Sequence, residues 1–149
     1  MGVSRDSSMP CYRGNPIRGS AGTRESADPA AEPLDPDVMR AVAGGDPLVI
    51  REMVQDFILA ALADIAEIRA AVDGERSDRV RSASHKLKGS SGLVGARRLV
   101  EVCRQLEAAG DLGNWQRITE LIPELERLMR EIETAADAYL RRTDLPATR

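Results

Sequence analysis

The chain has 149 residues, of which 42% are hydrophobic and only 3% aromatic, so one domain with an aliphatic core is expected. Its formal net charge of −3 excludes the strong basic field that attracts nucleic acid. One histidine and two cysteines exclude a multi-histidine metal site and a disulfide framework. No apolar run near the N-terminus is long enough for a signal peptide or a spanning helix, so we expect a soluble, cytoplasmic protein without a membrane partner.

The first part of the chain, residues 1–34, differs from the rest. It holds four of the eight prolines, four glycines and many serines, and its few apolar residues show no period. Such a segment cannot bury enough surface to offset the entropy lost on ordering. We therefore predict a disordered tail over residues 1–34, a helical domain over 35–142 and a second disordered end over 143–149.

Helical signals begin directly after this tail. The stretch "LDPDVMRAVAGGD" predicts a short leading helix, capped by Asp35 and ended by Gly44 and Gly45. Asp46 caps a second helix, which runs to about Val72. Its apolar residues recur at helical spacing and form one stripe: Ile50, Met53, Val54, Phe57, Ala61, Ile65 and Ile68.

Two further helices follow. The third is predicted from about Ser77 toward Val94, Gly95 marks a turn, and the fourth runs from Ala96 to about Ala109. The positions expected to face inward are Val80, Ala83, Leu87, Ser91, Val94, Leu99, Val102, Cys103 and Leu106.

The sequence "GDLGN" predicts the next loop, and a last helix runs from about Trp115 to Arg141. Pro123 lies inside that pattern and should either kink the helix or mark a late start. We find no strand pattern. Because short loops join long helices, the fold class is all-α, an antiparallel up-down-up-down four-helix bundle with a short leading N-terminal helix.

The single histidine lies in "SASHKLKGSSG". At 100° per residue, His85 lies about 200° from the inward-facing Leu87 and therefore faces solvent. Arg81 and Lys88 lie one turn away on either side. Repulsion from Lys88 disfavours imidazolium, and a neutral ring nitrogen is a nucleophile. If that nitrogen gained a phosphoryl group, Lys88 would become its counter-charge.

Two glycines share this face. Gly89 and Gly92 each cost about 1 kcal/mol relative to alanine in a helix interior. That cost makes sense if the backbone of a partner must come close to the ring. The residues alone leave two plain alternatives open: an ordinary surface histidine, and small residues that only allow close helix packing.

The segment "HKLKGSSGLVGARRLVEVCRQLE", residues 85–107, resembles the histidine-containing phosphotransfer (HPt) domain of two-component phosphorelays, and the resemblance extends over about residues 34–140. One departure is Ser84, where the family usually has alanine. We expect its hydroxyl to hydrogen-bond back to a backbone carbonyl. The positions that match the family pattern are His85, Lys88, Gly89, Ser90, Ser91, Gly95, Leu99, Cys103, Leu106 and Glu107.

The resemblance implies a role for each position. His85 would be phosphorylated, Lys88 would stabilise the phosphoryl group, and Gly89 would leave room for a receiver domain. The receiver's aspartate and Mg²⁺ would supply the catalytic machinery, so the chain would be a monomeric phosphoryl carrier without a cofactor of its own and not a kinase. The main alternative is a docking module that binds receivers without carrying phosphate. A purely structural bundle is the third reading.

A docking surface is also predicted. Ile58, Leu59 and Leu62 lie at the edge of the apolar stripe or outside it, and exposed apolar patches often mark binding surfaces. We assign them to receiver docking together with the glycine face, Arg81 and Glu107. Two alternatives stay open: the leading helix covers the three apolar residues, and Glu107 is a plain surface carboxylate.

Overall fold

The computed structural model describes residues 32–148, with side chains as far as residue 142. This part of the chain holds five helices and no strand, which confirms the all-α prediction. The predicted tail over residues 1–34 lies almost entirely outside the described residues, and so do the side chains of the predicted disordered end. The helices are α2 (Pro36–Val42), α3 (Pro47–Asp73), α4 (Ser77–Leu93), α5 (Arg97–Leu112) and α6 (Trp115–Thr148).

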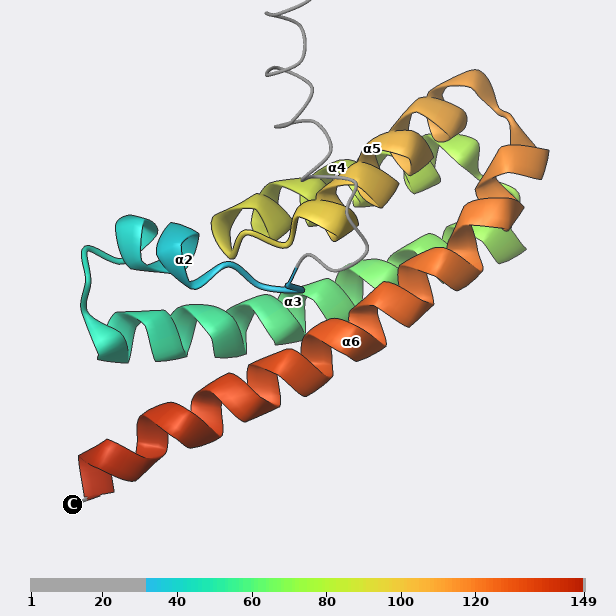
Figure 1. Ribbon diagram of the computed structural model, residues 1–149. Coiled ribbons are helices and arrows are strands. Elements are labelled where there is room, and N and C mark those ends of the chain that lie inside the picture. Colours follow the sequence, from blue (N-terminus) through green and yellow to red (C-terminus); the bar gives the residue numbers. More distant parts are fainter. Residues whose placement is uncertain (1–31, 149) are drawn as a thin grey trace, which may run out of the picture. The chain divides into compact units, whose positions relative to one another are not determined.

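Four long helices enclose one core. α3 contacts α4 and α6, and α5 contacts the same two helices, so each long helix has two long neighbours. Figure 1 shows α4 and α5 lying together against the longer pair α3 and α6. The short α2 packs on α3 and α4. None of the described helices combines the length and the low charge needed to cross a lipid bilayer.

The local signals at the starts of the first two helices behave as predicted. The carboxylates of Asp35 and Asp46 each accept a hydrogen bond from the backbone N–H two residues later, at 3.0 and 2.9 Å. A proline occupies the first turn of each helix, where its missing N–H is not needed.

Two helix boundaries differ from the prediction. α5 continues past Ala109 to Leu112, so Gly110 is helical and not part of a loop, and Gly113 ends the helix in the left-handed region at φ +66°. α6 begins at Trp115, as predicted, and ends at Thr148, beyond the predicted Arg141. It continues through Pro123, so the alternative of a late start is wrong. Apolar residues on both sides of Pro123 are buried, and their packing outweighs one lost helical hydrogen bond.

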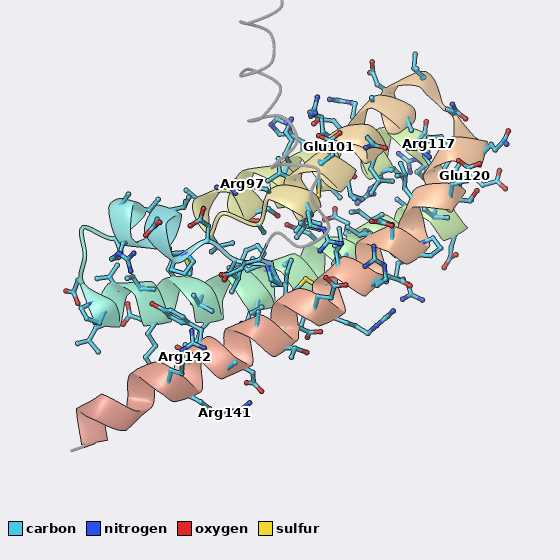
Figure 2. The ribbon with its side chains drawn as sticks, viewed as in Figure 1. Arg97, Glu101, Arg117, Glu120, Arg141 and Arg142 are labelled. Carbon is cyan, nitrogen blue, oxygen red and sulfur yellow. The ribbon has the colours of Figure 1, made fainter. Side chains whose placement is uncertain are left out.

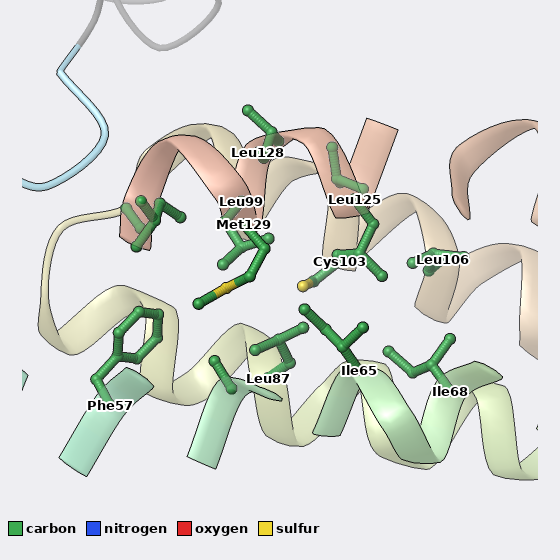
Figure 3. Packing of buried hydrophobic residues seen from close by; sticks show 14 of the residues in the cluster. Phe57, Ile65, Ile68, Leu87, Leu99, Cys103, Leu106, Leu125, Leu128 and Met129 are labelled. Atoms are coloured by element: carbon green, nitrogen blue, oxygen red, sulfur yellow. The ribbon is translucent and has the colours of Figure 1, made fainter. Parts of the chain in front are cut away.

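The core is aliphatic, as the composition predicts. Figure 3 shows Phe57, Leu87 and Leu106 facing inward from three different helices. The predicted inward-facing residues of α4 and α5 are all buried. Charged side chains such as Arg97 and Arg117 lie on the outer surfaces of the helices (Figure 2). The burial of apolar surface is therefore the main force that holds the four helices together.

Candidate functional site

The histidine lies where the helical spacing predicted. The His85 side chain, on α4, is 65% exposed, whereas Leu87 is completely buried. A Cβ atom added to Gly89 or to Gly92 would meet nothing within 4 Å. The surface on the C-terminal side of the ring is therefore open among residues 32–142, and these two glycines do not serve packing within that part of the chain.

A glutamate from the neighbouring helix completes the site. One carboxylate oxygen of Glu107, on α5, lies 2.8 Å from Nδ1 of His85, and the other lies 2.6 Å from Nζ of Lys88. We call these three residues the His85–Lys88–Glu107 cluster. Both oxygens of Glu107 are engaged by α4, and its part in docking stays a prediction.

The charges in the cluster decide which ring nitrogen is free. The hydrogen bond from Lys88 is the main cause that lowers the pKa of Glu107, and the bond to His85 lowers it further. Glu107 is therefore ionised at neutral pH and only accepts hydrogen bonds. In the neutral form of the ring, an ionised carboxylate 2.8 Å from Nδ1 requires the proton on Nδ1, which leaves the lone pair on Nε2.

The two lysines near His85, Lys86 and Lys88, form salt bridges with different helices. Nζ of Lys86 lies 3.0 Å from a carboxylate oxygen of Glu67 and 3.6 Å from one of Asp64, both on α3. The bond to Glu67 is the main cause that raises the pKa of Lys86. Lys86 thus joins α4 to α3, while Lys88 joins α4 to α5 and the imidazole. Helical spacing alone points to Lys88 and does not separate these two roles, because they depend on which helices lie beside α4.

Arg81 lies on the α5 side, as does the cluster. Its Nε is 3.9 Å from an oxygen of Asp111, which is a loose contact. A shallow hollow of about 320 Å³ beside the cluster is lined by Arg81, Arg104, Glu107, Ala108 and Asp111. The structure therefore brings Arg81 and Glu107 together, as the docking prediction grouped them.

The apolar residues assigned to docking lie elsewhere. Leu59 is 70% and Leu62 41% exposed, so the leading helix does not cover these two residues, whereas Ile58 is partly buried. Ile58 and Leu59 line a groove of about 630 Å³ with residues of α6, such as Glu133 and Leu140, and the lining of this groove includes no residue of α4. The structure does not bring Ile58, Leu59 and Leu62 into the cluster, and their role in docking stays a prediction.

Two small residues near the site behave differently from each other. Ser84 is buried, and its hydroxyl has no hydrogen-bond partner among the described side chains and backbone, so the expected bond to a backbone carbonyl does not form. Ser91, also buried, does make such a bond, to the carbonyl of Leu87 at 2.6 Å. Cys103 is buried among apolar residues (Figure 3), and burial raises its pKa to about 12, as befits a small core residue and not a reactive thiol.

Comparison with known proteins points in one direction. The model of the Hpt domain family matches residues 52–142. The crystal structure of histidine-containing phosphotransfer protein B (HptB) from Pseudomonas aeruginosa PAO1 is similar in fold, with a TM-score of 0.71 at 24% identity. That similarity covers 76% of this chain and 98% of that one. No curated protein sequence matches the chain.

Proposed function

The chain belongs to the Hpt domain family, and from that premise we propose that His85 accepts a phosphoryl group from a receiver-domain aspartate and passes it to a second receiver. The observation that carries the proposal is the His85–Lys88–Glu107 cluster. It holds one ring nitrogen of an exposed imidazole against a carboxylate and leaves the other ring nitrogen free toward solvent. A phosphoryl carrier needs this arrangement, because its nucleophile must be fixed in orientation and still be reached by a partner.

The transfer step follows from the protonation of the ring. The lone pair of Nε2 on His85 forms the bond to phosphorus, and the bond between phosphorus and the aspartyl oxygen breaks, leaving its electron pair on the receiver's carboxylate. Since Nδ1 keeps its proton, the ring gains positive charge as the N–P bond forms. The Glu107 carboxylate, 2.8 Å away, stabilises that charge. Transfer to the second receiver is the same step in reverse.

Lys88 serves as the counter-charge of the phosphoryl group. Its ammonium lies one helical turn from His85 and is already fixed by Glu107 at 2.6 Å. An ammonium group has three N–H donors, so Lys88 can bind a phosphoryl oxygen and keep its bond to Glu107. The cluster therefore accommodates the added negative charge without leaving the carboxylate unpaired.

The remaining machinery is proposed to belong to the partner. Among residues 32–142, no group of three or more histidine, cysteine, aspartate or glutamate side chains lies together in a way that could hold a metal ion. The receiver would contribute its aspartate and Mg²⁺, which neutralises charge on the phosphoryl oxygens. The chain would act as a monomeric carrier, without a cofactor of its own and without kinase activity.

We also propose that α3–α6 form an antiparallel up-down-up-down bundle. Contacts between α4 and α5 run in opposite order along the two helices, since Gly110 lies against Arg81 whereas Glu107 lies against His85. Short turns join α3 to α4 and α5 to α6, and in each case the two joined helices contact each other. Antiparallel neighbours are the expected result of such connections.

The receiver is proposed to dock over the open surface around His85, where Gly89 and Gly92 leave room, with a second contact at the exposed leucines of α3. The double substitution Leu59→Asp and Leu62→Asp tests that second contact. Both side chains are exposed, so the fold should be retained while transfer slows. Unchanged transfer by the folded variant would remove α3 from the docking surface.

The central experiment is phosphotransfer from a radiolabelled receiver domain to the full chain and to His85→Gln. We expect label on the wild type that is lost in acid and stable in base, as a phosphohistidine is, and no label on the variant. If several receivers bind both proteins without labelling either, the chain is a docking module. If none binds or transfers, it is a structural bundle and the proposal is wrong.

A further inference from the structure

Three glycines lie within helices near the site, and they differ in the space around them. Gly89 and Gly92 border open space. A Cβ atom on Gly110, by contrast, would lie 2.9 Å from the backbone nitrogen of Arg81, 2.9 Å from the carbonyl oxygen of Ser77 and 3.1 Å from Cα of Arg81. These are backbone atoms of α4, which cannot turn aside as the end of a side chain can. Gly110 therefore marks the place where α5 approaches the α4 backbone directly.

This contact lies one helical turn from the cluster on both helices. Gly110 follows Glu107 by one turn of α5 and shares its face, while Arg81 precedes His85 by one turn of α4. The contact of Gly110 with Arg81 and the contact of Glu107 with His85 are therefore successive steps along one interface. The separation of the helices at the first step determines how far Glu107 must reach at the second.

We propose that Gly110 is a positioning residue for the phosphoryl-accepting histidine. Its missing side chain sets the close approach of α5 to α4, and this approach places Glu107 within reach of His85 and Lys88 at once. The effect of Gly110 on the rate of phosphotransfer rests on the proposed function. Its effect on the orientation of the His85 ring can be observed in the protein without a receiver.

The geometry leaves little tolerance. An alanine at position 110 would require the two backbones to separate by about 0.5 Å or more, to bring contacts of 2.9 Å to the ordinary 3.4 Å. Glu107 makes bonds of 2.6 and 2.8 Å to two donors with one carboxylate, so a rotation that restores one bond weakens the other. The longer distance would weaken the hydrogen bond between Glu107 and the imidazole, and this bond is what selects the Nδ1–H tautomer.

The test uses the fact that His85 is the only histidine of the 149 residues, so the nitrogen NMR spectrum of the full chain contains a single imidazole. We expect the Nδ1–H tautomer in the wild type. Gly110→Ala should shift the ring toward the Nε2–H tautomer, and Glu107→Ala should do the same. Adding Gly110→Ala to Glu107→Ala should cause no further shift of the tautomer. Gly92→Ala is the matched control, the same substitution at an open position, and should leave the tautomer unchanged.

A folded Gly110→Ala protein with the wild-type tautomer would overturn the proposal and reduce Gly110 to a packing residue. Should Gly110→Ala fail to fold, Glu107→Asp decides, because it withdraws the carboxylate by one methylene and leaves the contact of Gly110 with α4 intact. A wild-type tautomer in Glu107→Asp would show that the approach distance is unimportant and would equally overturn the proposal.

The effect on transfer is a separate measurement. Loss of ring orientation should slow phosphotransfer to folded Gly110→Ala by about 10- to 100-fold. If the wild type accepts no phosphate from any receiver, the proposed function fails, whereas the tautomer of Gly110→Ala still decides whether Gly110 positions the ring. The two failures are therefore distinguishable.

Discussion

Two lysines of α4 form salt bridges with different neighbouring helices, Lys86 with α3 and Lys88 with α5, and their surroundings differ. Lys86 is exposed and pairs with Glu67 of α3 at 3.0 Å. Lys88 is half-buried and bonds to Glu107 of α5 at 2.6 Å, and the same carboxylate binds His85. Only the pair on the α5 side shares its carboxylate with His85.

The difference shows why a salt bridge near a functional residue is not by itself functional. The α3-side pair is exposed, and pairs of that kind add little to stability. The α5-side pair takes part in a network in which one carboxylate sets the protonation of a ring nitrogen and the position of a cation.

The largest contrast is expected in transfer by lysine variants. Lys88→Ala removes the counter-charge of the phosphoryl group and should slow phosphotransfer by about 10- to 100-fold, because a fixed charge at the reacting group lowers the barrier directly. Lys86→Ala, two residues away, removes an equal charge from the other side and should change the rate by less than about 2-fold. The rates are measured with one receiver under single-turnover conditions. Equal losses would mean that net charge, and not the cluster, controls the reaction.

The next effect concerns the buried serine beside the histidine. Ser84→Ala removes a hydroxyl that has no hydrogen-bond partner and should raise the free energy of unfolding by about 1 kcal/mol. Ser91→Ala is the matched control, because its hydroxyl bonds to the carbonyl of Leu87 and its loss should not stabilise. Urea unfolding of the three proteins measures the difference. A destabilised Ser84→Ala protein would show that the hydroxyl has a partner.

Much of this arrangement could be predicted from local sequence signals. The aspartate caps, the inward stripe and the outward direction of His85 all follow from helical periodicity, which depends only on nearby residues. The bond from Glu107 to the ring could not be predicted in the same way, because it depends on the distance between two helices. Gly110 sets that distance, but the glycine-rich sequence "GDLGN" predicts a loop at this position, since glycine usually ends helices.

The docking residues show a second limit of sequence reasoning. Periodicity places Leu59 and Leu62 outside the apolar stripe, and both are exposed as that predicts. It does not tell which neighbouring helix lies beside them. In the structure Ile58 and Leu59 border α6 and not the histidine helix, because the order of helices around the core is a property of the whole bundle.

A smaller effect on stability is expected on the open face of α4, where Gly89 lies. Gly89→Ala meets no neighbouring atom, so the better helix propensity of alanine should raise the free energy of unfolding by about 1 kcal/mol or less. The added methyl group should nevertheless slow transfer, since it occupies space reserved for the receiver. Thermal unfolding and transfer rates measured on the same preparation test both parts. A variant that gains stability and keeps full transfer would show that receivers do not approach this glycine.

The smallest effect is a pair of opposite pH dependences on the two sides of α4. Lys88 holds the pKa of Glu107 below its ordinary value of 4.5, so Glu107 stabilises the fold above that pH, and the contribution is lost as pH falls through the lower folded-state pKa. The stability advantage of wild type over Glu107→Gln should therefore shrink on acidification.

Asp64, on the α3 side, has the opposite sign. Burial raises its pKa above the ordinary 3.8, so its charged form is disfavoured in the folded state, and wild type should gain stability relative to Asp64→Asn as pH falls through the raised value. Urea unfolding between neutral pH and about pH 3 measures both differences, and other carboxylates cancel because each variant is compared with wild type. If both stability differences changed with pH in the same direction, Glu107 and Asp64 would not have the opposite pKa shifts that their surroundings predict.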